Sequence, residues 1–225
     1  MQRDNLQGNP LEKLRDNPRD SWQEAWTTAV ELAVDELRQV DLEECCSRSG
    51  AVWNREDAVL GLSFLNRAYK VRIPEFDVIS ETGEEAPIRE KILLLHYLQT
   101  ASGTPLKGEW IAFTQVPSGE LYLGNFRARS VDRLVRSFDG RETELVEMAE
   151  ALEGVAGEYG DVSVVLRALP RVPVALVLWR GDEEFPPSGD VLFDATVVDY
   201  LPMEDMVVLA EMVASQLCNK KGKAV

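Results

Sequence analysis

The chain has 225 residues, of which 45% are hydrophobic and 28% charged, the usual balance of a soluble globular protein with enough apolar material for a core. Its 24 basic and 39 acidic residues give a formal net charge of −15, which repels phosphate backbones, so we expect no nucleic-acid partner. The longest apolar run, "VPVALVLW", is too short to cross a bilayer, and the N-terminus lacks the apolar stretch of a signal peptide, so we expect a cytoplasmic protein with no membrane partner.

The N-terminal part of the chain is predicted to be helical after a polar start. Residues 1–19 contain two prolines and a glycine among polar residues, and we expect a flexible arm there. Apolar residues recur every three or four positions over 21–40, as in an amphipathic helix, and Ser21 followed by Glu24 fits a capping box at its start. A short helix is expected at 42–49.

The middle of the chain is predicted to contain two β-hairpins separated by a helix. Strand-forming residues gather in 57–73, where Asn66-Arg67 fits the tip of the first hairpin. After a loop, "IREKILLLHYLQTA" at 88–101 predicts a helix. In "GEWIAFTQVPSGELYLGNF", residues 108–126, two strand-like runs flank a Pro-Ser-Gly turn and predict the second hairpin.

The C-terminal half predicts a clustered set of strands between helices. Helices are expected at 130–140, 142–154 and 202–218, and strands at 161–170 and 172–180, with a short strand in "VLFDATVVDYL". The strand at 172–180 is apolar on both faces, which places it in the middle of a covered sheet.

This grouping decides the predicted fold class. Because the strands cluster instead of alternating with helices, we predict an α+β fold with a mainly antiparallel mixed sheet and helices packed on it. No linker separates two halves, so residues 20–218 are predicted to form a single domain, followed by a basic tail at 219–225.

Recognisable enzyme motifs are absent from the sequence. It has no phosphate-cradling glycine loop, no G-x-S-x-G and no H-E-x-x-H. With one histidine, His96, and three cysteines without a C-x-x-C spacing, the chain alone cannot build a multi-histidine or four-cysteine metal site. We therefore favour a binding protein over an enzyme.

An acidic, proline-stiffened loop is the first candidate site. In "ALVLWRGDEEFPPSGDVLFDAT" the apolar strand ends at Trp179 and is followed by several carboxylates. These carboxylates would repel one another unless a bound cation neutralised them. Two prolines after Phe185 fix the backbone, and we expect this bend to lie at the mouth of a concavity. The alternative is a solvated turn. The candidate metal ligands are Asp182, Glu183, Glu184 and Asp194.

His96 and three aromatic residues form the candidate cofactor-binding set. On a helix, His96 lies off the main apolar stripe, on the side of Arg89 and Thr100. It is either a hydrogen-bonded structural residue, or an axial ligand of a metal or tetrapyrrole, or a proton carrier. The aromatic candidates lie at strand ends and in the acidic loop, where they either pack or stack on a flat ligand; they are Trp110, Trp179 and Phe185.

Three stretches resemble an uncharacterised family. The segments "KILLLHYLQTASGTPLKGEWIAF", "LPRVPVALVLWRGDEEFPPSGDVLFDAT" and "DYLPMEDMVVLAEM" are similar to the domain-of-unknown-function family 3786, found mostly in anaerobic bacteria and archaea. The resemblance covers roughly residues 25–217. Its motifs fall on the candidate residues above and also on Glu109, Pro186, Leu192 and Phe193.

The resemblance implies a partner more than a reaction. Some members are joined to a small iron–sulfur domain of the kind associated with corrinoid proteins of one-carbon metabolism, and this chain lacks that cysteine-rich extension. A corrinoid or iron–sulfur protein is therefore the partner that the family implies.

Three functional hypotheses follow. The first is an accessory protein of anaerobic redox or one-carbon metabolism that holds a metal or tetrapyrrole-type cofactor or docks a partner. The second is a carboxylate-based enzyme with Asp194 or Glu184 as general base and His96 as acid, which requires these groups to meet in one pocket. The third is an interaction domain whose acidic face binds a basic partner.

Overall fold

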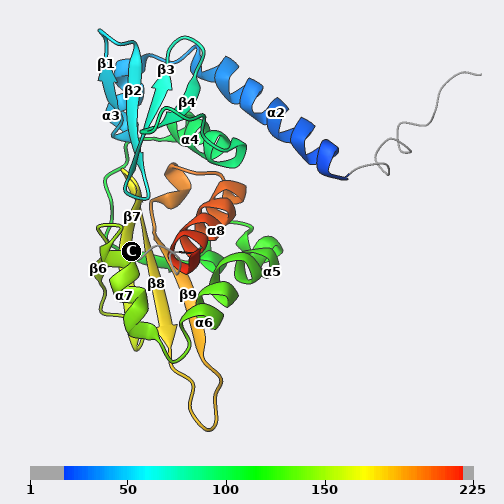
Figure 1. Ribbon diagram of the computed structural model, residues 1–225, viewed down its shortest axis with the longest axis vertical. Coiled ribbons are helices and arrows are strands. Elements are labelled where there is room, and N and C mark those ends of the chain that lie inside the picture. The colour runs from blue at the N-terminus through cyan, green and yellow to red at the C-terminus, as the bar shows by residue number, and fades with distance from the viewer. Residues whose placement is uncertain (1–17, 220–225) are drawn as a thin grey trace, which may run out of the picture.

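The computed structural model describes residues 18–219 and has the α+β architecture that the sequence predicts (Figure 1). All strand pairs are antiparallel, but the strands divide between a four-stranded sheet, ordered β1-β2-β3-β4, and a five-stranded sheet, ordered β5-β9-β8-β7-β6. One continuous apolar core joins the two sheets and the helices. The predicted arm at residues 1–19 lies outside the described residues except for Pro18 and Arg19, which belong to the first helix.

The element bounds are as follows. The helical elements are α2 (Pro18–Leu37), α3 (Leu42–Ser49), α4 (Ile88–Thr100), η1 (Phe113–Gln115), η2 (Gly119–Tyr122), α5 (Leu123–Phe126), the π-helical η3 (Arg127–Val131), α6 (Asp132–Phe138), α7 (Glu142–Glu150), η4 (Val197–Asp199) and α8 (Met203–Asn219). The strands are β1 (Val52–Asn54), β2 (Val59–Phe64), β3 (Arg67–Arg72), β4 (Asp77–Ser80), β5 (Trp110–Ala112), β6 (Val155–Ala156), β7 (Val162–Leu169), β8 (Val172–Trp179) and β9 (Ser188–Asp194).

The predicted helix starts and ends hold to within a few residues for most helices. The first helix is an exception, because it begins at Pro18, so Ser21 lies inside it and does not cap it. The last helix, α8, includes Asn219, which shortens the predicted tail; residues 220–225 lie outside the described residues. Within residues 18–219, no helix combines the length and the apolar character needed to span a membrane.

The first hairpin is present, with its turn one residue earlier than predicted. Phe64 pairs with Arg67, so the two turn residues are Leu65 and Asn66, not Asn66-Arg67. Both have positive φ, 48° and 57°, the backbone of a type I′ turn, whose twist matches that of the flanking strands. Leu65 adopts this unfavourable conformation because its side chain is buried and its N–H donates to the carbonyl of Ala168 at 2.9 Å.

The second predicted hairpin, at 108–126, is wrong. Only β5 is a strand, and it pairs with β9; residues 119–138 are helical. Two phenylalanines explain the difference, because Phe113 and Phe126 stack with ring centroids 4.1 Å apart in the core, which requires the chain to fold back compactly. Gly119 makes that turn possible, since a Cβ at this position would lie 2.1 Å from the Phe113 carbonyl oxygen.

The large sheet confirms the prediction for the apolar strand at 172–180. In the order β5-β9-β8-β7-β6, β8 is the central strand, and Val174 through Leu178 are buried. The two sheets meet where β7 is irregular, at the register shift between Arg167 and Leu169. This irregularity leaves the Ala168 carbonyl to accept the bond from the β2–β3 turn, and so joins the small sheet to the large one.

Candidate functional site

Helices α4 and α8 cross through a row of polar contacts on one side of α4. Arg89 donates two hydrogen bonds to the Glu211 carboxylate, at 2.7 and 2.8 Å, and His96 Nδ1 lies 2.7 Å from Asp205 Oδ2. The Thr100 hydroxyl lies 2.5 Å from the Tyr200 carbonyl oxygen, just before α8. The face of α4 that carries these three residues is the one that the sequence assigned to His96.

His96 is held by its carboxylate partner. The hydrogen bond with Asp205 raises the pKa of His96; burial opposes this shift, and the negative charges of Asp205 and Glu36 add to it. The Asp205 side chain is only 8% exposed, so the pair is largely screened from water. The hydrogen bond that the sequence offered as one alternative for His96 is thus present, and His96 is not among the residues that line the pocket described below.

The Asp194 carboxylate holds two neighbouring loops through hydrogen bonds. Its two carboxylate oxygens accept hydrogen bonds from the backbone N–H groups of Lys107, Gly108 and Thr196 and from the Thr196 hydroxyl, at 2.7 to 3.2 Å. Burial raises the pKa of Asp194, but these bonds outweigh it and leave the pKa below its usual value. With four donors directed at it, the carboxylate has its acceptor sites occupied.

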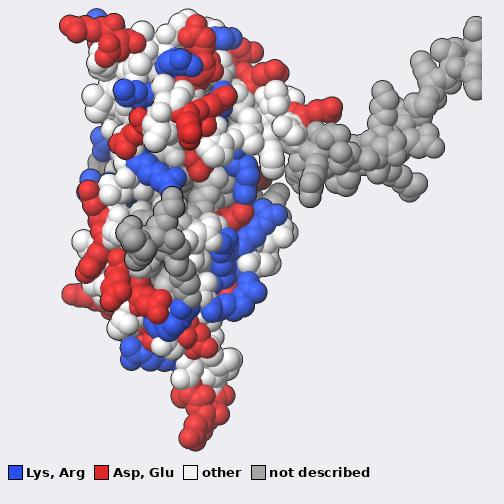
Figure 2. Space-filling view, viewed as in Figure 1, with Lys and Arg blue, Asp and Glu red and all other residues white. Residues whose placement is uncertain are grey.

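The acidic loop is an exposed finger. Residues 180–187 connect β8 to β9 and project at the lower end of the molecule, where red atoms gather in the space-filling view (Figures 1 and 2). Asp182 accepts hydrogen bonds from the backbone N–H groups of Glu184 and Phe185, both at 2.8 Å, and so shapes the tip. The Phe185 side chain is 66% exposed. The expected position at the mouth of a concavity is not observed.

The predicted metal and cofactor residues are not brought together. Asp194 is at the opposite end of β9 from the finger, six residues or about 20 Å along the strand. Trp110 pairs with Asp194 and Trp179 with Ser188, so that distance also separates the two tryptophans. Among residues 18–219, no three His, Cys, Asp or Glu side chains are grouped to hold a metal ion.

The enzyme hypothesis requires Asp194 or Glu184 to lie close to His96, and each of these side chains has a different environment. His96 contacts Asp205, Asp194 contacts backbone amides, and Glu184 is on the exposed finger. Helix α4, which carries His96, lies in the upper half of the molecule and the finger at the lower end (Figure 1). The proposed base and acid therefore do not share a pocket.

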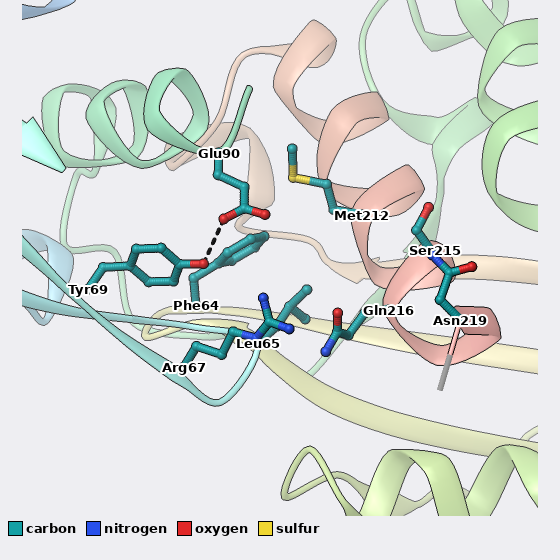
Figure 3. Close-up of a pocket in the computed structure, with 9 residues that line it drawn as sticks. All are labelled: Phe64, Leu65, Arg67, Tyr69, Glu90, Met212, Ser215, Gln216 and Asn219. Carbon is teal, nitrogen blue, oxygen red and sulfur yellow. Dashed lines mark hydrogen bonds between the residues drawn. The ribbon is translucent and has the colours of Figure 1, made fainter. Parts of the chain in front are cut away.

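A cavity of about 220 Å³ lies where the small sheet, α4 and the second half of α8 meet (Figure 3). The apolar part of its wall comes from the strained turn and α8, namely Phe64, Leu65 and Met212. Its polar wall comes from β3, the first turn of α4 and the last turns of α8, and consists of Arg67, Tyr69, Glu90, Ser215, Gln216 and Asn219.

Two opposite charges line this cavity without neutralising each other. Arg67 enters from the small sheet and Glu90 from α4, and within the described part of the chain no salt bridge joins either of them to a partner. The Tyr69 hydroxyl donates to Glu90 Oε2 at 2.6 Å. Burial raises the pKa of Tyr69 to about 12; Glu90 adds to this shift and Arg67 opposes it. The phenol therefore stays protonated and donates to one Glu90 oxygen, and the other oxygen remains available.

Sequence reasoning missed this pocket. The sequence indicated Arg67 only as a turn residue, and Tyr69 lay unremarked within the strand-forming stretch 57–73. Alternation along β3 signals that Tyr69 and Val71 share the inner face, but no local pattern places that face beside α8, which lies some 140 positions further along the chain.

A comparison with known protein families shows which family the chain belongs to. The family described as domain of unknown function DUF3786 matches residues 41–216, most of the described chain. The chain belongs to this family. The match includes both sheets, α4 and nearly all of α8, and therefore the pocket residues of this family member except Asn219. No curated protein and no solved structure matches the chain.

Proposed function

We propose that this chain is a binding protein for a small zwitterion of the amino-acid type, held in the cavity between the small sheet and α8. The observation that carries the proposal is the presence of Arg67 and Glu90 on the same cavity, of opposite charge and not paired with each other. A ligand carboxylate would pair with the guanidinium, and a ligand ammonium group with the free oxygen of Glu90.

The rest of the wall matches such a ligand. Phe64, Leu65 and Met212 offer apolar contact to its side chain, and Met adapts its shape to different groups. Gln216 and Asn219 supply amide donors and acceptors beside the charges. A cavity of 220 Å³ has the volume of about seven liquid waters, which suits a molecule of amino-acid size.

Calorimetry with matched ligands tests this proposal. A short aliphatic amino acid such as leucine or methionine is expected to bind, whereas the same carbon skeleton with only the carboxylate, or only the amine, is expected to bind at least about tenfold more weakly, because each charge has its own partner. Equal affinity for all three, or heat from none of the twenty standard amino acids, would contradict the proposal.

Variants assign the site. Arg67→Met and Glu90→Gln are each expected to weaken amino-acid binding at least about tenfold. Arg72→Met is the matched control, since Arg72 is an exposed arginine of the same strand that pairs with Asp77 at 3.1 Å, away from the cavity. It should leave the affinity unchanged. If Arg72→Met and Arg67→Met have the same effect, binding does not occur in this cavity.

A further inference from the structure

A cluster of arginines gathers beside α8 on a protein that is otherwise strongly acidic. We call it the arginine face; it is formed by Arg89 of α4, Arg127 and Arg129 of η3, and Arg133 and Arg136 of α6. Segment η3 packs against both α6 and α8, which makes the cluster continuous. Figure 2 shows blue atoms concentrated over this region.

The arginine face has more positive charge than its own carboxylates neutralise. The Glu211 carboxylate forms salt bridges with Arg89 at 2.7 Å and with Arg129 at 3.6 Å. The Asp132 carboxylate lies 3.8 Å from the Arg127 guanidinium. Among residues 18–219, no salt bridge joins Arg133 or Arg136 to a carboxylate; Arg133 donates instead to Ser215 and Asn219, and Arg136 to the backbone carbonyl of Asp132. Because the excess charges repel one another, the face favours an anionic occupant.

The chain itself carries a complementary element, the acidic finger at residues 180–187. Asp182, Glu183 and Glu184 at its tip are exposed, and the turn around Asp182 fixes their backbone. Phe185 is 66% exposed beside them. On the other side, Leu121 of η2 is 82% exposed, and η2 packs against α5 next to the arginine face. An apolar contact between these two residues would accompany the ionic ones.

We propose that two copies of this chain associate about a two-fold axis, with the acidic finger of each copy lying on the arginine face of the other. Both surfaces are visible from the same side of the molecule in Figure 2, as a contact made twice about one two-fold axis requires. Such an interface is self-complementary, and it closes at two copies instead of growing into a filament. The argument for it does not use the proposed ligand pocket, although Arg133 of the arginine face donates to Ser215 and Asn219 of the pocket wall.

Molecular mass in solution tests the association. By light scattering after size-exclusion chromatography, the wild-type chain is expected to have twice the monomer mass at about 20 mM salt and to return towards the monomer at about 500 mM, because screening weakens contacts between charges. A monomer at about 100 µM protein in the low-salt buffer, where such charge pairs are strongest, would overturn the proposal.

Charge reversal gives a sharper test. Glu183→Lys with Glu184→Lys places a basic finger on a basic face, and Arg127→Glu with Arg136→Glu places an acidic finger on an acidic face, so each variant alone is expected to be a monomer. Mixed at equal concentration, the two variants are expected to form a heterodimer, since both finger contacts then join opposite charges. This rescue cannot arise if the substitutions merely unfold the chain. Variants that stay monomeric when mixed would overturn the two-fold arrangement.

Matched controls carry the same charge changes elsewhere. Glu81→Lys with Glu84→Lys, and Arg38→Glu with Arg72→Glu, alter exposed residues of the other half of the molecule. They are expected to remain dimers at low salt. If they dissociate as the finger and face variants do, net charge and not this interface controls the association, and the proposal fails.

Discussion

His96 of α4 and Asp205 of α8 lie 2.7 Å apart, in the middle of the row of polar contacts that joins the two helices. Asp205 is nearly buried, and His96 is one-quarter exposed. The pair thus fixes the register of two helices that would otherwise meet through apolar side chains, which specify position less strictly. It also makes the junction sensitive to pH, because the hydrogen bond with Asp205 raises the pKa of His96.

The first prediction concerns stability and pH. The folded-state pKa of His96 is raised above its ordinary value of 6.5, so the pair contributes its full stability below about pH 6.5 and loses it as the pH rises through the higher folded-state pKa. The free energy of unfolding, measured by urea denaturation, should therefore fall as the pH rises above about 6.5.

The variant His96→Gln is the control for this dependence of the free energy of unfolding on pH. The chain has one histidine, so the variant should show a flatter profile over the same range. A variant whose stability still falls as steeply as that of the wild type would assign the pH dependence to another group.

A second prediction concerns Asp194. In Asp194→Asn, an amide NH₂ replaces one of the oxygens that accept backbone N–H groups, so two donors face each other and the charge is lost. The expected loss in the free energy of unfolding is about 2–4 kcal/mol. Glu183→Gln in the exposed finger should change it by less than about 0.5 kcal/mol. Equal effects of the two substitutions would show that the Asp194 bonds contribute little.

A third prediction concerns the Tyr97 hydroxyl, which is buried between three segments. It donates to the Ser49 carbonyl at the end of α3 and accepts from the Arg171 N–H in the β7–β8 turn. Tyr97→Phe should cost about 2–4 kcal/mol, because it leaves two buried backbone groups without a partner. Tyr122→Phe, at a half-buried position without a hydroxyl hydrogen bond among the described residues, is the comparison and should be nearly neutral in thermal unfolding.

A fourth prediction concerns the pair Arg89–Glu211. Both side chains are mostly buried, and the pair is bidentate. Glu211→Gln should destabilise the chain by about 2–3 kcal/mol, because several arginines then face each other without a shared carboxylate. A double-mutant cycle with Arg89→Met should give a coupling energy of at least about 1 kcal/mol. Additive effects would show that the two side chains do not stabilise each other.

The accuracy of the sequence-based predictions depended on how local the deciding interactions are. Helix α4 and strand β8 follow from periodicity and apolar content within one window, and both are where the sequence placed them. Residues 108–126 have the local pattern of a hairpin, yet the stacking of Phe113 on Phe126 in the core outweighs it. Strands β1 and β4 were not predicted, because such short edge strands carry little periodic signal.

The sequence by itself determined the α+β class, the family and the helices and strands whose pattern repeats locally, because burial of one face imposes that pattern on neighbouring residues. Only the tertiary structure decided that the acidic loop is an exposed finger, that His96 pairs with Asp205, and that Arg67 and Glu90 share a cavity. These relationships join residues far apart in the chain. Their geometry depends on how whole elements pack, and no local pattern encodes that.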